Sequence, residues 1–277
     1  MVFLDILKAA LFGVVEGITE WLPVSSTGHM ILLDQFAGFT TVSENFFSLF
    51  EVVIQLGAIL AVIMLYFRRL NPFTTSSGHF QIKVPTLNLW GKIIIACLPA
   101  AIFGVLLGDK IDSALHKPVP IAVALILVGF AFIWVENRNH GIRPSITKLN
   151  QLSYKAAFII GLFQLVAAIF PGTSRSGATI IGALLIGVAR PVAVEFTFML
   201  AIPVMLGASL LKIAKYSSVL SGSELFILFI ACLVAFVVSM AVIKALIGYI
   251  KRHNFKGFGI YRIVLGIIVI IVFAVKH

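Results

Sequence analysis

The sequence predicts an all-α integral membrane protein with six transmembrane helices and two re-entrant helical hairpins in an inverted-topology repeat. Of the 277 residues, 60% are hydrophobic and only 12% are charged, whereas about 25% of residues are charged in a soluble domain. The apolar runs are continuous, which is typical of membrane helices and not of the alternating strands of a membrane barrel. Two apolar segments also share similar polar interruptions. We expect one integral-membrane domain over residues 1–277.

Six apolar runs have the length that a helix needs to cross a bilayer, about 17–25 residues. They are residues 46–67, 89–108, 119–137, 192–214, 224–249 and 258–275. Glu51, Gln55 and Glu195 lie within or at the edges of these runs and are candidates to line a cavity. Arg68 and Arg69 fit the role of interfacial anchors.

Two further apolar segments, residues 2–37 and 154–188, are each broken near the middle. The first is broken near Pro23 and the second near Pro171, and each proline is followed by a cluster of Ser, Thr and Gly. Pro and Gly end one helix, and Ser or Thr caps the start of the next. Each half has about 15 residues, which is too short to cross a bilayer. We therefore expect each segment to enter and leave the membrane on the same side.

The two broken segments resemble each other. At one fixed offset the matched pairs are Gly13 with Gly161, Glu16 with Gln164, Pro23 with Pro171, Ser25 with Thr173 and Ser26 with Ser174. The glycine after each turn matches with a slip of one residue. Three spans follow each segment, so we expect a first repeat over residues 1–137 and a second over residues 154–277. An odd number of spans inverts the second copy, and the two turns then meet near the midplane, where such folds place their site.

The distribution of basic residues predicts the orientation. The net charge is +10, and because the cations gather in loops we expect contacts with lipid headgroups and none with nucleic acid. In the re-entrant topology one side receives Arg68, Arg69, Lys83, Arg138, Arg143, Lys148, Lys155, Arg190, Lys251, Arg252 and Lys256. That side is predicted to be cytoplasmic, with both termini on the outer side.

Glu16 and Glu20 are four residues apart and share one helix face. Two carboxylates at that spacing repel each other unless they share a cation or a proton. The pair therefore indicates either a divalent metal site or an acid/base pair in catalysis. A pair of solvated or capped carboxylates without a catalytic role is the alternative.

Polar groups follow at the turn: Ser25, Ser26, Thr27 and His29. A hydroxyl and an imidazole at this separation form a nucleophile and a base if they reach each other. Plain helix capping by Ser and Thr, and a buried structural histidine, are the alternatives.

Arg175 lies in the second turn, among Thr173, Ser174 and Ser176. A guanidinium at membrane depth requires an anion, and its shape suits phosphate or carboxylate. The helix N-terminus beside it also favours phosphate. The alternative is a buried ion pair of Arg175 with Glu16 or Glu20, which a substrate phosphate displaces. The whole set suits phosphoryl transfer or hydrolysis of a phosphate at the membrane.

The segments from Glu16 to His29 and from Pro171 to Thr179 closely resemble the undecaprenyl-pyrophosphate phosphatase family of the bacitracin-resistance type. The resemblance covers essentially the whole chain. It implies hydrolysis of undecaprenyl pyrophosphate to undecaprenyl phosphate and inorganic phosphate, which recycles the lipid carrier of cell-wall synthesis. It also implies a multi-pass protein of the bacterial inner membrane with a site open to the outer leaflet, a divalent cation such as Mg or Ca, and the option of a homodimer.

Carried onto this chain, the resemblance implies catalytic roles for Glu16, Glu20, Ser26, His29 and Arg175. It implies substrate contacts for Ser25, Thr27, Thr173, Ser174, Arg175 and Ser176. Glu16 and Glu20 are also the candidate metal ligands. We favour Ser26 as the nucleophile, with His29 or Glu20 taking its proton, while His29 or water as the nucleophile stays open. Inverted repeats with broken helices also occur in transporters, so a polyprenyl-phosphate transporter or flippase is the alternative function.

Overall fold

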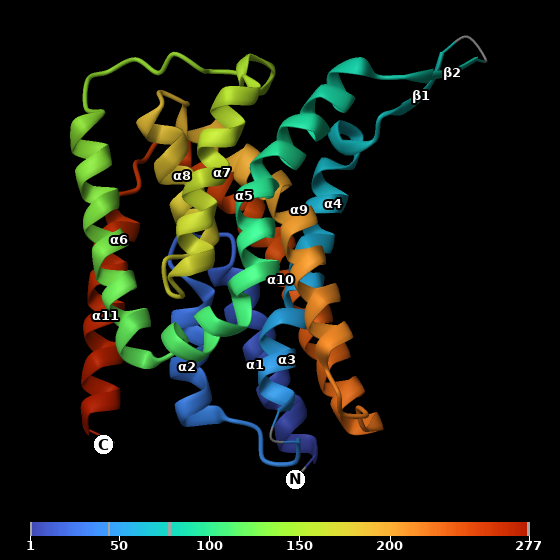
Figure 1. The fold of residues 1–277 in the computed structure, drawn as a ribbon, viewed down its shortest axis with the longest axis vertical. Coiled ribbons are helices and arrows are strands. Elements are labelled where there is room, and N and C mark those ends of the chain that lie inside the picture. The colour runs from blue at the N-terminus through green and yellow to red at the C-terminus, as the bar shows by residue number, and fades with distance from the viewer. Residues whose placement is uncertain (1, 44, 77–78, 276–277) are drawn as a thin grey trace.

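The chain, seen in a computed structural model that describes residues 2–43, 45–76 and 79–275, is almost entirely helical (Figure 1). The α-helices are α1 (Val2–Thr19), α2 (Ser26–Ala37), α3 (Phe46–Val53), α4 (Gln55–Leu70), α5 (Val84–Leu115), α6 (Pro118–Arg138), α7 (Tyr154–Ile169), α8 (Arg175–Leu185), α9 (Arg190–Lys215), α10 (Gly222–Ile250) and α11 (Lys256–Val275). A short 3₁₀ helix, η1 (Leu149–Gln151), precedes α7.

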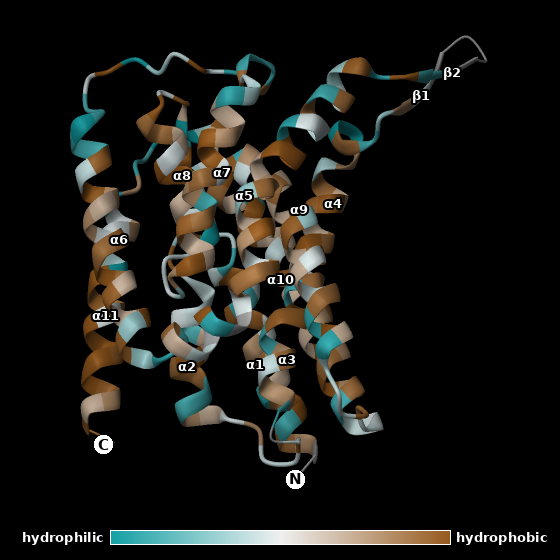
Figure 2. Ribbon diagram, viewed as in Figure 1, coloured by the Kyte–Doolittle hydropathy of each residue, from teal (hydrophilic) through white to brown (hydrophobic). Residues whose placement is uncertain are grey.

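Six helical segments among the described residues are long and apolar enough to cross a membrane, as the sequence predicts. They are Phe46–Leu70, Val84–Gly108, Pro118–Arg138, Arg190–Lys215, Gly222–Ile250 and Lys256–Val275. The first consists of α3 and α4, which join at the buried Ile54. Brown, apolar ribbon covers the middle of these helices, and teal, polar residues gather toward their ends and at the turns between the short helices (Figure 2).

The remaining helices form two pairs, α1 with α2 and α7 with α8. The helices α2, α7 and α8 have 12, 16 and 11 residues, but α1 has 18 and is longer than the predicted half of about 15 residues. In Figure 1 the α1–α2 pair occupies the half of the molecule that holds both termini, and the α7–α8 pair occupies the other half. The turns that join the two members of each pair therefore meet near mid-height. The open end of the first pair is tied together by Asp5, which accepts hydrogen bonds from Thr40 and Thr41 beyond α2.

The second helix of each pair begins with the same unusual cap. Ser25 and Ser174 precede α2 and α8 with φ angles of 74° and 68°, and they are the described non-glycine residues with positive φ. Each serine hydroxyl accepts a hydrogen bond from a glycine N–H three residues later, Gly28 or Gly177. By backbone and cap, Ser25 corresponds to Ser174 and not to Thr173, so the one-residue slip between the two segments already occurs before the cap.

A small β-ribbon departs from the all-α expectation. Strands β1 (Phe73–Ser76) and β2 (His79–Ile82) pair antiparallel between α4 and α5, with Phe73 opposite Ile82 and Thr74 opposite Gln81. The segment is rich in Thr and aromatic residues, which favour strands, and it lies outside the apolar spans. A two-stranded ribbon of this length has no long apolar run, so the hydropathy pattern that predicts the spans does not predict the ribbon.

Close contacts between helices rely on glycine. A Cβ at Gly57 in α4 would lie 2.1 Å from the backbone oxygen of Cys232 in α10. A Cβ added to Gly129 in α6 would lie 2.7 Å from the carbonyl oxygen of Gly259 in α11, and a Cβ added to Gly259 would lie 2.7 Å from that of Gly129. Small residues allow such approach between membrane helices, and these contacts fix the frame that holds the two turns.

Candidate active site

A single buried guanidinium holds the two turns together. Arg262, in α11, is 0% exposed. It donates to the carbonyl of Pro23 in the first turn at 3.2 Å and to those of Gly172 and Thr173 in the second, both at 2.8 Å. Because a carbonyl buried without a donor is costly, this contact stabilises the approach of the two turns.

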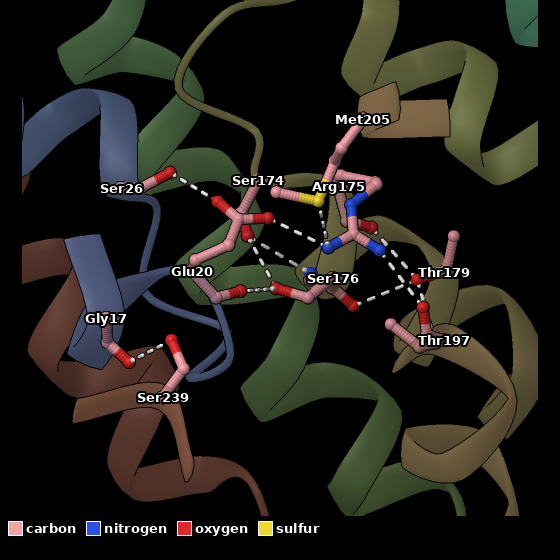
Figure 3. A network of polar contacts seen from close by, with 11 residues as sticks. Gly17, Glu20, Ser26, Ser174, Arg175, Ser176, Thr179, Thr197, Met205 and Ser239 are labelled. Atoms are coloured by element: carbon pink, nitrogen blue, oxygen red, sulfur yellow. Dashed lines mark hydrogen bonds and ion pairs between the residues drawn. The ribbon is translucent and has the colours of Figure 1, made fainter. Parts of the chain in front are cut away.

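Glu20 is the centre of a polar network that joins the turns (Figure 3). One of its carboxylate oxygens accepts a hydrogen bond from the Ser26 hydroxyl at 2.7 Å. The other accepts from the Arg175 guanidinium at 2.8 Å. The structure therefore contains the buried ion pair of Arg175, with Glu20 as its partner.

Residues of α8 and α9 hold Arg175 in place. Its guanidinium also donates to the carbonyl of Thr197 at 3.0 Å, and the hydroxyls of Thr179 and Thr197 are 2.9 Å apart behind it. The Ser176 hydroxyl donates to the backbone carbonyl of Glu20 at 3.2 Å. The second turn thus orients both the cation and the main chain of its carboxylate partner.

A cavity of about 240 Å³ lies beside this network, on the side of α1, α2 and α3. Its lining residues are Glu16, Ser26, Thr27, Met30, Ser48, Glu51, Val52, Gln55, His116 and Lys212. Ser26 belongs to both sets, because its side chain lines the cavity while its hydroxyl donates to Glu20. A phosphate in the cavity would therefore face a hydroxyl that already has a hydrogen-bonded carboxylate.

His29 does not take part in the Ser26 hydrogen bond. Its Nδ1 lies 2.7 Å from the carbonyl oxygen of Ser25, and its Nε2 lies 2.7 Å from the hydroxyl of Tyr261. The His29 and Tyr261 rings stack with an angle of 9° between their planes. With both ring nitrogens engaged, His29 orients the first turn against α11, and Glu20 is the group in contact with the Ser26 proton.

Glu16 presents an unpartnered oxygen at the cavity. The residue is 1% exposed, and its Oε1 has no hydrogen-bond partner. Hard cations such as Mg²⁺ prefer oxygen ligands and are often held by one or two carboxylates plus substrate phosphates. Among the described residues no group of three or more His, Cys, Asp or Glu has metal-binding geometry. Glu16 alone therefore suits a cation shared with a bound phosphate, while both oxygens of Glu20 are already engaged.

The remaining predicted residues divide by location. Thr27 lines the cavity with Ser26. Ser25 and Ser174 cap α2 and α8, and the Ser174 hydroxyl is 3.1 Å from that of Ser176. Thr173 is buried and supplies a carbonyl to Arg262. These four residues shape the two turns, and the two caps leave the N-terminal N–H groups of their helices directed toward the meeting point.

The cavity contains partners that the motifs do not include. Glu51 and Gln55 line it, as their positions in a span suggest, whereas Glu195 lies elsewhere and pairs with Arg69. His116 approaches Glu51, with 3.8 Å between the imidazole and carboxylate. Arg262 is not among the residues predicted from the sequence. Its position within a predicted span could have identified it, since a cation within a transmembrane span indicates a specific role.

Comparison with known proteins identifies relatives over the full length of the chain. The family model described as bacitracin resistance protein BacA matches residues 9–268. An undecaprenyl-diphosphatase of Desulfitobacterium hafniense is 54% identical over 276 residues, covering 100% of this chain and 99% of the relative. Undecaprenyl-diphosphatase 1 of Clostridium acetobutylicum is 54% identical, covering 99% and 100%, and an undecaprenyl-diphosphatase of Enterococcus faecalis is 53% identical, covering 99% of both.

Proposed function

The chain belongs to the family of bacitracin resistance protein BacA, and we infer from this membership and from its site that it is an undecaprenyl-diphosphatase. It hydrolyses undecaprenyl pyrophosphate to undecaprenyl phosphate and inorganic phosphate. The observation that supports this function most directly is Ser26, which lines a cavity and is hydrogen-bonded to Glu20. Recycling of the carrier lipid for cell-wall synthesis, and bacitracin resistance, follow from that activity.

We propose that Ser26 attacks the terminal phosphorus of the substrate. Its Oγ forms the new P–O bond, Glu20 takes the hydroxyl proton, and the bond from the terminal phosphorus to the bridging oxygen breaks. Undecaprenyl phosphate leaves, and the phosphate stays on Ser26. Glu20 then releases the hydroxyl proton to solvent. Water attacks the phosphorus of the phosphoserine, Glu20 takes a proton from the water, and the bond from phosphorus to the Ser26 oxygen breaks. The Ser26 oxygen takes the proton back from Glu20, and inorganic phosphate is released.

Arg175 stabilises the charge that develops in this reaction. In the structure the Arg175 guanidinium contacts a carboxylate oxygen of Glu20. When the substrate enters, its phosphate takes the place of that oxygen as the anion bound to Arg175. Fixed donors aimed at developing charge are among the largest contributions to catalysis.

We also propose that Glu16 holds a divalent cation such as Mg²⁺ or Ca²⁺. When bound, it would neutralise charge on the diphosphate oxygens. The unpartnered Oε1 of Glu16 supports this assignment. The two engaged oxygens of Glu20 favour Glu16 over Glu20 as the residue that holds it.

We also propose that the α1–α2 and α7–α8 pairs are re-entrant hairpins of an inverted repeat in the bacterial inner membrane. The short lengths of α2, α7 and α8, the matched serine caps and the opposed positions of the two pairs support this arrangement. The cavity and both termini then face the outer side, because the basic loops lie at the other end of the helices.

The test is phosphate release by the purified protein in detergent, where transport across a membrane has no meaning. Ser26→Ala removes the proposed nucleophile, and Glu20→Gln removes the base, for which a loss of about 10²–10⁴-fold in kcat is expected. The matched control is Ser113→Ala, because the Ser113 hydroxyl is exposed and bonds only locally, to the carbonyl of Lys110.

A second measurement separates Ser26 from water as the attacking group. Substrate labelled in its terminal phosphate, quenched in acid during turnover, should leave label on wild-type protein and none on Ser26→Ala. Near-normal turnover of Ser26→Ala would reject the serine mechanism, and absence of hydrolysis by the wild-type protein would reject the function.

A further inference from the structure

A second cavity lies at the opposite end of the helices from the catalytic one. It has a volume of about 840 Å³ and lies between the end of α4, the starts of α5 and α9, and the loop before α7. Four cations line it, Arg68, Arg69, Lys92 and Lys148, together with one carboxylate, Glu195. Four positive charges against one negative charge give these lining residues a net charge of +3. No part of the proposed hydrolysis uses this cavity.

The charge is not balanced by the cavity's own carboxylate. Glu195 pairs with Arg69 at 2.5 Å, which leaves three cations in excess. Lys148 lies in a loop, where the usual excess of basic residues on the cytoplasmic side explains it. Lys92 is different, because it is half-buried about two turns from the start of α5, with its ammonium 5.9 Å from the centre of the Tyr154 ring. A half-buried cation that lines a cavity favours an anion as the occupant of that cavity.

The cavity also contains neutral hydrogen-bonding groups. Thr86, Asn88, Thr147 and Asn150 line it beside the cations. Ammonium, guanidinium, hydroxyl and amide groups together donate to phosphate oxygens. The cations and these neutral groups come from α4, α5, η1 and the loop before η1, so their convergence is a property of the fold and not of one basic segment.

Exposed apolar side chains lie beside the cavity on α7. Tyr154, whose ring centre is 5.9 Å from the Lys92 ammonium, is exposed, and Phe158 and Leu162 follow it with exposed side chains. Their spacing of four residues keeps them on one side of the helix. A soluble anion makes no contact with such a stripe, whereas the acyl chains of a lipid pack against it.

We propose that this basic cavity binds the phosphate-bearing headgroup of an anionic membrane lipid, with the acyl chains along the exposed face of α7. Basic pockets between membrane helices are suited to such headgroups. The lipid belongs to the leaflet opposite the one that the catalytic cavity faces. The site is independent of the proposed hydrolysis, because it shares no residue with the catalytic cavity.

The experiment measures lipid binding to the full-length protein in detergent by native mass spectrometry. Phosphatidylglycerol should bind the wild-type protein at least about tenfold more tightly than it binds Lys92→Ala/Lys148→Ala, a difference of about 1.4 kcal/mol. The matched control is Lys251→Ala/Arg252→Ala, which removes two exposed cations between α10 and α11, outside the cavity. Phosphatidylcholine, which carries the same tails and no net charge, should bind all three proteins equally weakly.

Further arms identify the source of the phosphate and guard against misfolding. Glycerol phosphate and inorganic phosphate should fail to displace phosphatidylglycerol. Displacement by either compound would show that the cavity binds a soluble anion and not a lipid. Lys148→Glu reverses one exposed charge and should weaken binding even if the double variant unfolds. Unchanged binding to Lys148→Glu, or an equal loss in the Lys251→Ala/Arg252→Ala control, would overturn the proposal. Phosphate release in detergent should be the same in every folded variant.

Discussion

At the catalytic cavity the charges of individual residues present a problem for an anionic substrate. Glu16 and Glu51 line the cavity, and a diphosphate that enters it meets both carboxylates. Lys212, near the end of α9, is the lysine among the residues that line it. Arg175 is engaged by Glu20 before the substrate enters. Lys212 is therefore the cation available to the entering substrate.

Lys212→Ala should raise KM by about tenfold with a smaller change in kcat, since a hydrogen bond to a charged group contributes about 1.5–3 kcal/mol and this contact forms before the reaction. Steady-state kinetics in detergent measure both constants. Lys110→Ala removes a cation that lies outside the cavity lining and should leave both constants unchanged. An equal KM effect in the two variants would assign the change to bulk charge, and an unchanged KM in Lys212→Ala would remove the residue from the binding site.

The residues that motif reasoning finds are those whose chemistry is unusual in an apolar segment. Glu16, Glu20, Ser26 and Arg175 are polar groups at membrane depth, so the cost of burying them marks them in the sequence. Their roles are harder to predict, because the choice of partner depends on rotamers and approach distances. His29 follows Ser26 by three residues, yet its ring bonds to Ser25 and Tyr261. Only the fold shows that Glu20 is the closer base.

At the scale of helices, the contact between α4 and α10 depends on Gly57. An added Cβ would lie 2.1 Å from the carbonyl oxygen of Cys232, which is backbone and has little room to move. Gly57→Ala should therefore lower stability by about 1–3 kcal/mol, the usual cost of overpacking. Thermal unfolding of the purified protein in detergent measures the change.

Gly248→Ala is the matched control for that substitution. Gly248 lies in α10, the same contact partner, and an added Cβ there meets no atom within 4 Å. Alanine favours a helix interior over glycine by about 0.5–1 kcal/mol, so this variant should be as stable as the wild type or slightly more stable. A Gly57→Ala protein that unfolds at the same temperature as Gly248→Ala would show that α4 and α10 are not in fixed contact.

Elements whose length is set by the bilayer are predictable from sequence, and those outside it are not. The six apolar runs recover the spans, because a helix must satisfy all its backbone groups across the apolar layer. The β-ribbon from Phe73 to Ile82 and the extension of α5 to Leu115 lie beyond the apolar runs. In these segments local contacts determine whether the chain forms a strand, a helix or a loop, and hydropathy does not predict those contacts.

For the whole molecule, the topology follows from whether α7 and α8 cross the membrane or return to the same side. Ile142, in the segment between α6 and α7, and Val219, in the segment between α9 and α10, are both exposed. These two segments lie at opposite ends of the helices (Figure 1). If the pair is re-entrant, one further span separates it from Val219, and the two residues lie on opposite sides of the membrane. If residues 154–188 crossed as a simple span, Ile142 and Val219 would lie on the same side.

Labelling of single cysteines decides between these topologies. With Cys97 and Cys232 replaced by Ala, a membrane-impermeant maleimide added to spheroplasts should label Val219→Cys at once and Ile142→Cys only after the membrane is permeabilised. This outcome follows from the basic loops that lie on the side of Ile142 and from the proposed return of the α7–α8 pair to that side. Labelling of both residues from one side would contradict the re-entrant pair. The reverse pattern would keep that pair but place the catalytic cavity toward the cytoplasm, away from the outer leaflet where the proposed substrate is released.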